Sequence, residues 1–147
     1  MAAREKLIGT WKLVSWEISY SPDGAVTCPF GQNPEGILIY SPDGYMSANI
    51  SQADRSRFNS ASVRKASEVE KCMAFESNFS YAGPFTIEGD HVIHRVDHAL
   101  NPMMVGTIQR RHMEFVDRSL ILSAEETLGE KNRRHRLHWV KAEPNHD

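Results

Sequence analysis

The chain has 147 residues, of which 40% are hydrophobic and 24% charged, and it carries 17 Lys and Arg against 19 Asp and Glu. Such a length and composition predict one globular domain over residues 1–147 and exclude a disordered tail or a collagen-like repeat. The formal net charge of −2, with basic and acidic residues interspersed, argues against nucleic acid as a partner.

The absence of targeting signals and the spacing of the cysteines indicate where the protein is located and how its thiols are used. No apolar run approaches the roughly 18 residues that a membrane-spanning helix needs, and residues 1–8 lack the apolar segment of a secretory signal. We therefore expect a cytoplasmic protein without membrane association. Cys28 and Cys72 lie far apart with no metal-type spacing, so both are expected to be unpaired thiols, with Cys72 on the buried face of a helix.

The first half of the chain is marked by a repeated turn sequence. Tyr-Ser-Pro-Asp-Gly occurs at residues 20–24 and again at 40–44. Proline presets φ, Asp hydrogen-bonds within the turn and Gly takes a left-handed conformation, so each copy predicts a β-hairpin. The flanking strands are expected at Thr10–Tyr20, Gly36–Tyr40 and Tyr45–Ile50. The inward face of the first changes near residues 13–14, as a β-bulge requires.

The middle of the chain has helical periodicity. Between Val63 and Phe79 apolar residues recur at intervals of three and four, which predicts one amphipathic helix of about 16 residues, roughly 24 Å long. Its apolar face, with Val69, Cys72 and Phe75, is expected to pack against the rest of the domain. The polar loop at residues 51–62 precedes it.

Alternation with period two then resumes to the end of the chain. Strands are predicted at Phe85–Glu88, His91–Leu100, Val105–Val116, Leu120–Glu125 and Arg134–Lys141. Eight or nine short strands with one inserted helix predict an all-β fold, an antiparallel meander that closes into a β-barrel. The basic run from Lys131 to Arg136 is interpreted as a solvated hairpin tip, because acidic residues precede it.

Several segments resemble the bacterial and fungal lipocalin-like domain family. These are Gly9-Thr10-Trp11, Pro29-Phe30-Gly31, residues 36–47, the strand with His94, and residues 105–111. The resemblance extends from about Leu7 to Val140 and implies a calycin-type barrel. The Gly-x-Trp start is similar to the first lipocalin motif, which implies that Trp11 plugs the closed end under a basic side chain, either Arg136 or Lys141.

A barrel of this size holds one small ligand in its lumen, so the candidate site lies there. On residues 91–100 the more apolar face, with Val92 and Val96, also carries His94 and His98. His94 is the candidate acid or base, because imidazole changes charge near neutral pH; the alternative is a hydrogen-bonded wall residue. Four residues apart on a strand, His94 and His98 lie about 13 Å from each other and cannot share one metal ion, and no metal site is expected.

The neighbouring strand and several aromatic residues complete the candidate site. If Met113 and Phe115 point inward, Gln109 and Arg111 do so too, and a buried guanidinium needs a carboxylate such as Glu17 or an anionic or carbonyl-bearing ligand. We take His94 and Arg111 as catalytic candidates. The ligand-binding candidates are Trp16, Tyr40, Tyr45, His98, Gln109, Met113, Phe115 and Trp139.

Nucleophile-elbow, phosphate-loop, dinucleotide-binding, zinc-protease and kinase motifs are missing from the sequence, so any catalysis is expected to need no cofactor. The favoured hypothesis is an isomerase, cyclase or lyase that acts on a hydrophobic small molecule in secondary or aromatic metabolism. The alternatives are a non-catalytic carrier of such a molecule and an interaction domain with a filled barrel. Exposed strand edges would also be compatible with a homodimer.

Overall fold

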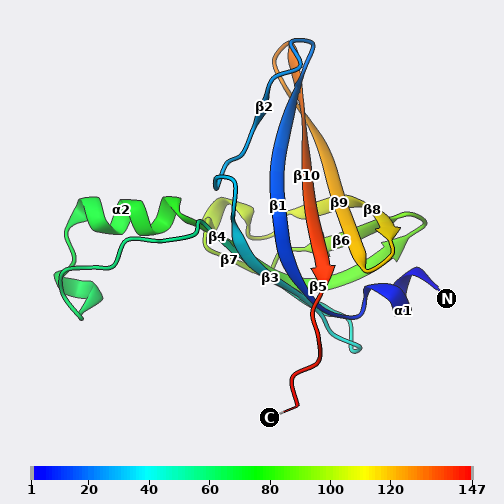
Figure 1. Cartoon of the computed structure of the whole chain (residues 1–147), viewed down its shortest axis with the longest axis horizontal. Coiled ribbons are helices and arrows are strands. Elements are labelled where there is room, and N and C mark those ends of the chain that lie inside the picture. The colour runs from blue at the N-terminus through cyan, green and yellow to red at the C-terminus, as the bar shows by residue number, and fades with distance from the viewer. Residues whose placement is uncertain (1, 147) are drawn as a thin grey trace.

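The computed structural model describes residues 2–146 and shows a closed antiparallel β-barrel (Figure 1). Eight strands pair in chain order, and the last pairs back with the first, which closes the barrel. They are β1 (Gly9–Ser21), β3 (Glu35–Tyr40), β4 (Tyr45–Ser51), β5 (Asn78–Glu88), β6 (His91–Arg95), β8 (Ile108–Val116), β9 (Ser119–Leu128) and β10 (Lys131–Lys141). The predicted all-β barrel is therefore confirmed.

Two short strands add to this barrel at its edges. β2 (Val26–Thr27) pairs with the end of β1 after the first Tyr-Ser-Pro-Asp-Gly turn, and β7 (His98–Ala99) pairs with β5. The second copy of the turn joins β3 to β4. Both copies thus close hairpins, as predicted. The pairing of β1 with β10 removes the main strand edges on which the expectation of a homodimer rested, and the dimer stays a prediction.

Alternation along the strands separates the lumen from the outer surface. On β4 the side chains of Met46, Ala48 and Ile50 are buried, while their sequence neighbours are largely exposed. Successive residues of a strand point to opposite faces, so this pattern directs every second side chain inward. The predicted bulge in β1 is present, because its register with β10 shifts between Leu13 and Ser15.

The closed end of the barrel is built around Trp11. Its indole Nε1 donates a hydrogen bond of 2.9 Å to the carbonyl oxygen of Leu7, at the end of the short helix α1 (Ala3–Leu7). The basic side chain above the ring is that of Lys141, whose Nζ lies 4.6 Å from the ring centroid. The structure thus selects Lys141 from the two alternatives, whereas Arg136 is exposed and pairs in register with Glu17 on β1.

The predicted helix over residues 63–79 is shorter than expected and packs differently. It is divided into a 3₁₀ turn η1 (Val63–Lys65) and the helix α2 (Glu68–Glu76), and β5 begins at Asn78. Ser67 caps α2 by accepting a hydrogen bond from the Glu70 backbone, while the Glu70 side chain accepts one from the Ser67 backbone.

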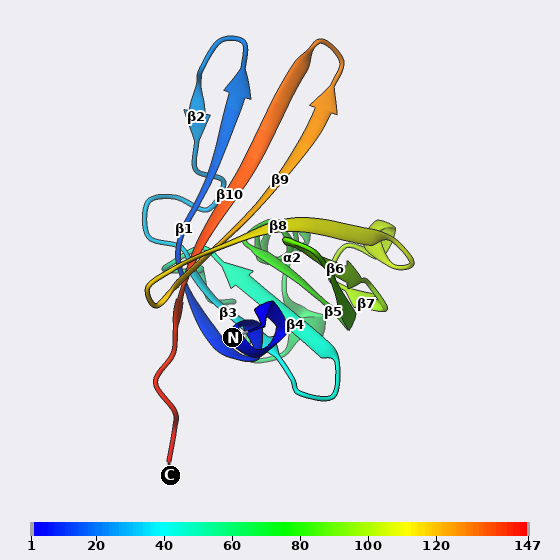
Figure 2. The same cartoon turned by 90° about the vertical axis from the view of Figure 1, so that its right-hand side faces the viewer.

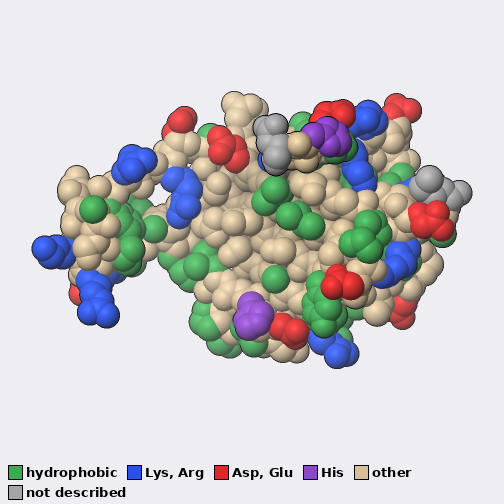
Figure 3. Space-filling model, turned by 90° about the horizontal axis from the view of Figure 1, so that it is seen from below, with side chains coloured by type: hydrophobic (Ala, Val, Ile, Leu, Met, Phe, Trp, Pro, Cys, Tyr) green, Lys and Arg blue, Asp and Glu red, His purple; other side chains and the backbone are tan. Residues whose placement is uncertain are grey.

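No residue of α2 is buried, which corrects the expectation that its apolar face packs on the barrel. Val69 is 68% exposed, Phe75 is 47% exposed and Cys72 is also exposed. The helix belongs to an arm, residues 52–77, that projects away from the barrel (Figure 1). Figure 3 shows hydrophobic side chains at the surface of this arm, on the left of the view. The helix forms over residues 68–76 of the predicted span, but because it lies on the projecting arm its apolar face is not buried against the barrel.

The strand predicted over residues 91–100 is interrupted. β6 ends at Arg95 and the chain crosses toward β5, where the backbone of Asp97 donates a hydrogen bond of 2.9 Å to the Ala82 carbonyl. The crossing needs Gly83, because a Cβ atom there would lie 1.8 Å from the Arg95 carbonyl oxygen. The interruption leaves His94 inside the barrel and places His98 outside it.

The hairpins β1–β2 and β9–β10 extend beyond the barrel as a projecting sheet (Figure 2). Together with the arm they explain why the chain exposes 9627 Å² in all, more than the roughly 7,600 Å² expected for a compact chain of this mass. The inner face at the base of this sheet continues the wall of the lumen. Within residues 2–146, the helices are all too short to span a membrane.

Candidate functional site

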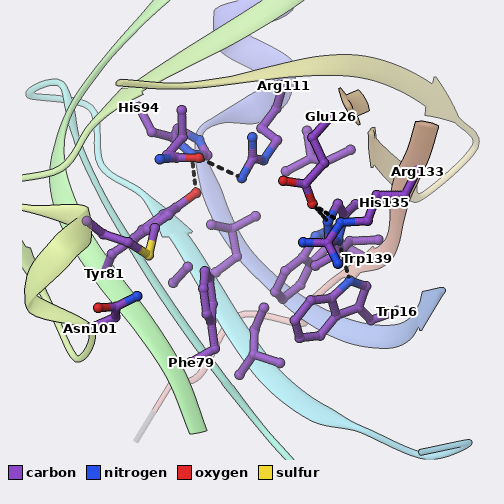
Figure 4. A pocket seen from close by; sticks show the side chains of 17 residues that line it. Trp16, Phe79, Tyr81, His94, Asn101, Arg111, Glu126, Arg133, His135 and Trp139 are labelled. Atoms are coloured by element: carbon purple, nitrogen blue, oxygen red, sulfur yellow. Dashed lines mark hydrogen bonds and ion pairs between the residues drawn. The ribbon is translucent and has the colours of Figure 1, made fainter. Parts of the chain in front are cut away.

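A cavity of about 370 Å³ lies in the lumen and reaches the base of the projecting sheet (Figure 4). This volume is in the range of small-molecule sites. Apolar side chains form most of its wall, and polar groups gather at two places on it. The lining residues are Trp16, Leu38, Ala48, Ile50, Phe79, Tyr81, His94, Asn101, Met104, Gln109, Arg111, Leu122, Glu126, Arg133, His135, Leu137 and Trp139.

The first polar group centres on His94, which is 1% exposed. The hydroxyl of Tyr40 lies 2.7 Å from its Nε2, and the hydroxyl of Tyr81 lies 2.7 Å from its Nδ1. Tyr40 lies behind His94 and does not line the cavity, whereas Tyr81 does. The three rings come from β3, β6 and β5 and form a hydrogen-bonded chain that ends at the cavity wall.

Burial and charge keep His94 neutral. Desolvation by burial, and then the positive charge of Arg111, lower the pKa of His94 from 6.5 to about 3. A neutral imidazole carries one donor and one acceptor nitrogen. The buried Tyr40 hydroxyl hydrogen has Nε2 of His94 as its acceptor, so we assign the ring proton to Nδ1, which donates to the oxygen of Tyr81. The hydroxyl hydrogen of Tyr81 is then available to a molecule in the cavity.

Arg111 lies next to this chain on the cavity wall. One of its Nη atoms donates a hydrogen bond of 3.2 Å to Oε1 of Gln109, and the Gln109 amide donates one of 2.9 Å to the Thr107 hydroxyl. In the part of the chain that the structure describes, no ion pair involves Arg111. The Glu17 partner considered from the sequence is therefore not its partner. Burial raises the pKa of Tyr81, and the positive charge of Arg111 opposes that rise.

The second polar group lies at the base of the projecting sheet. One oxygen of Glu126, Oε1, accepts hydrogen bonds from Nε2 of His135, at 2.7 Å, and from Nε of Arg133. Nδ1 of His135 accepts a hydrogen bond of 3.2 Å from the indole of Trp16. Partial burial opposes ionisation of Glu126, but the hydrogen bonds from His135 and Arg133 outweigh it and hold its pKa below the ordinary value.

One buried donor remains without a partner. Trp139 is 1% exposed and lines the cavity, and within residues 2–146 its Nε1 is the buried side-chain donor that has no hydrogen-bond acceptor. An unsatisfied buried donor is costly, so this indole is a candidate contact for an acceptor atom of a bound molecule.

The structure brings half of the ten predicted site residues to the cavity, namely Trp16, His94, Gln109, Arg111 and Trp139. Tyr40 contacts the site only through His94. The other predicted residues lie elsewhere: Tyr45 is 56% exposed beside the turn, His98 is exposed on β7, Met113 is in the core, and Phe115 packs near Trp11 at the closed end. Met113 and Phe115 lie on the inward face of β8, one of the two faces that the sequence left open, but the cavity begins at the opposite end of β8.

Sequence reasoning misses several residues that line the cavity. The helical pattern includes Phe79 and no predicted element includes Tyr81, yet both lie in β5. Arg133 and His135 belong to the predicted solvated hairpin tip, whereas both are half-buried and face the cavity. A signal for them is present, because residues 133, 135, 137 and 139 alternate and the last two, Leu137 and Trp139, are apolar.

A closed antiparallel barrel around a largely apolar cavity defines a calycin-type barrel, an architecture that fits the binding of a small hydrophobic molecule. The chain belongs to the lipocalin-like domain family, whose model matches residues 8–142. The resemblance seen in the sequence is thereby confirmed. A search of the curated proteins finds no match to this chain.

Proposed function

We propose that the protein binds a small hydrophobic molecule with a carbonyl or carboxylate oxygen in the barrel lumen. We propose further that it catalyses a cofactor-free isomerisation, cyclisation or elimination of this molecule. The observation that carries the proposal is the chain Tyr40–His94–Tyr81, which presents a hydroxyl to an apolar cavity beside the guanidinium of Arg111.

Each group in this chain has a role that its geometry supports. Tyr81 donates a hydrogen bond to the ligand oxygen, and Arg111 stabilises negative charge that develops there, as preorganised donors do in an oxyanion hole. His94 has both ring nitrogens engaged by tyrosines, so it acts through Tyr81 and not directly on the ligand. This changes its expected role from acid or base to a positioning residue.

The second candidate function is a carrier that binds the same molecule without turnover. The observation that favours it is the fixed hydrogen bonding of the polar wall, where His94, Gln109 and Arg111 all have protein partners. Such a wall selects and holds a ligand whether or not a reaction follows.

The experiment that separates the two begins with a thermal-shift and native mass spectrometry screen of apolar metabolites, followed by product analysis for each hit. For an enzyme, Tyr81→Phe is expected to lower turnover about 10²–10³-fold with a small effect on affinity. The matched control is Tyr45→Phe, which removes a hydroxyl from an exposed ring. Hits that bind tightly and are recovered unchanged would reject catalysis and identify a carrier.

A further inference from the structure

Two opposite charges line the same cavity without neutralising each other. Arg111 and Glu126 both line it, and in Figure 4 the hydrogen bond drawn from the Arg111 guanidinium runs to the polar group beside His94 and not to Glu126. The ion pairs found among residues 2–146 include Glu126 with Arg133 and with His135, but not with Arg111. A cation and a carboxylate held apart in this way leave room for a ligand between them.

The two oxygens of the Glu126 carboxylate differ in their hydrogen bonding. Oε1 accepts both hydrogen bonds, from His135 and Arg133, whereas Oε2 has no partner among the described residues. Figure 4 shows the second oxygen turned away from His135 and Arg133, toward the side of the cavity where Arg111 lies. Glu126 lines the cavity and its side chain is 40% exposed, and a carboxylate oxygen with free lone pairs at such a wall is able to accept a proton from a ligand.

The orientation of this carboxylate is fixed by the residues behind it. Nδ1 of His135 accepts a hydrogen bond from the Trp16 indole, so Nε2 is the ring nitrogen that donates to Glu126. His94, in contrast, has no nitrogen free to take a proton from a ligand. Glu126 is therefore the base that the cavity offers, with His135 as its positioning residue.

We propose that Glu126 is the catalytic base of this site and that its substrate is an enolisable ketone or unsaturated ketone, bound between Glu126 and the pair Tyr81 and Arg111. This inference rests on the proposed function and specifies its substrate class. The site would hold the carbonyl oxygen against Tyr81 and Arg111 and place an adjacent C–H bond at Oε2 of Glu126.

The reaction is a proton shift that balances without a cofactor. Oε2 takes the proton from the carbon next to the carbonyl, the C–H electron pair forms a C=C bond, and the C=O pair moves to the oxygen. The resulting enolate oxygen accepts a hydrogen bond from Tyr81 and lies beside the charge of Arg111. Protonated Glu126 then returns the proton to the same carbon, or to the γ-carbon of a β,γ-unsaturated ketone, which yields the conjugated isomer.

The charge states of Glu126 and of the pair Tyr81 and Arg111 are compatible with this assignment. Hydrogen bonds keep the pKa of Glu126 below its ordinary value, so the base is ionised at neutral pH. A carboxylate remains a sufficient base when strong donors stabilise the enolate, as an Asp does beside a tyrosine and a second donor in known ketone isomerisation, although a lowered pKa makes Glu126 the weaker base of the two. Tyr81 with Arg111 supplies such donors here.

The test uses 2-tetralone, a small apolar ketone with acidic C–H bonds, as the probe. Binding is followed by quenching of tryptophan fluorescence, since Trp16 and Trp139 line the cavity, and proton exchange is followed by NMR in D₂O. The wild-type protein is expected to bind the probe and to accelerate exchange at the carbons next to the carbonyl above the buffer rate.

Glu126→Gln is expected to lower the exchange rate about 10²–10⁴-fold with little change in affinity. The matched control is Glu125→Gln, which alters the neighbouring exposed carboxylate and is expected to leave exchange unchanged. If Glu126→Gln does not fold, Glu126→Asp keeps the charge but withdraws the oxygen by one methylene, and it is expected to slow exchange too. His135→Gln should shift the pH profile of exchange toward that of an unassisted carboxylate.

Three results would overturn the inference. These are exchange that Glu126→Gln leaves unchanged, binding of 2-tetralone without exchange, and no binding of 2-tetralone to the wild-type protein. None of them decides the proposed function, which is judged separately by turnover of hits in the metabolite screen and by Tyr81→Phe.

Discussion

The Nζ atom of Lys141 lies 4.6 Å from the centroid of the Trp11 ring and donates a hydrogen bond of 2.6 Å to the carbonyl oxygen of Ile8. One lysine from the last strand thus covers the indole of the first strand and ties down the chain that enters it. Desolvation by burial, with a contribution from the charge of Arg118, lowers the pKa of Lys141. The contact closes the end of the barrel away from the cavity.

Trp11→Phe is expected to reduce the free energy of unfolding by roughly 1–3 kcal/mol, because it removes the hydrogen bond to Leu7 and weakens the cation–π contact. Ligand affinity per folded molecule should not change, since Trp11 does not line the cavity. Chemical denaturation and ligand titration measure the two quantities. Lys141→Met keeps most of the volume and removes the cation, and a loss of about 0.5–2 kcal/mol is expected. A Trp11→Phe protein of normal stability that no longer binds ligand would contradict this orientation of the barrel.

Gly9→Ala is expected to destabilise the protein by about 1–3 kcal/mol, measured by thermal or chemical denaturation. Gly9 has a φ of +131°, and a Cβ atom there would lie 2.5 Å from Nζ of Lys141. The substitution therefore strains the backbone and displaces the lysine from Trp11. Gly129→Ala is the control, because Gly129 also has a positive φ, +64°, but a Cβ atom there would extend into open space. Equal losses for the two variants would show that the lysine contact adds nothing.

His94 makes stability depend on pH. The folded state holds the pKa of His94 at about 3, against 6.5 for the ordinary group, so between these values the unfolded chain binds a proton that the folded chain does not. The contribution of neutral His94 to the free energy of unfolding is fully present above pH 6.5. Below that pH the free energy of unfolding falls by up to about 1.4 kcal/mol per pH unit.

Urea denaturation at several pH values checks this dependence. His94→Gln has no imidazole to protonate, so only the wild-type protein loses stability through this group as the pH falls. The difference in free energy of unfolding between wild type and variant is therefore expected to narrow from pH 6.5 toward about pH 4. The control is Val92→Ala, at a buried residue of the same strand that carries no titratable group, and it should keep a constant difference. A constant difference for His94→Gln as well would mean that His94 binds a proton as readily in the folded state as in the unfolded chain.

Phe75→Ala is expected to cost less than about 1 kcal/mol, because Phe75 is 47% exposed on the projecting arm. Phe85→Ala, at a ring that is 4% exposed and packs edge-on against Tyr40 at 4.9 Å, should cost about 3–5 kcal/mol. Denaturant midpoints of the two variants give the comparison. A loss of several kcal/mol for Phe75→Ala would indicate that the arm packs on the barrel in solution.

Local signals along the chain suffice to predict the strands, the hairpins and one face of the barrel wall. Period-two alternation and the two Tyr-Ser-Pro-Asp-Gly turns lead to the barrel, to the bulge after Leu13 and to the inward placement of His94. The start of the first strand, with Gly9 and Trp11, locates the closed end through its resemblance to the lipocalin motif. Alternation and turns depend on side-chain direction and turn chemistry, which nearest neighbours in the chain control.

The meeting of particular side chains, in contrast, depends on the pairing of strands that are distant in sequence. Tyr40, Tyr81 and His94 come together in this way, and Glu126 meets His135 across the β9–β10 hairpin. Helical periodicity predicts that one face of α2 is apolar, but it does not show whether another part of the protein packs against that face. The exposure of α2 was therefore not predictable from the sequence. A single residue, Gly83, lets the chain cross after Arg95 and separates buried His94 from exposed His98, because close approach of two backbones is a property of the folded barrel.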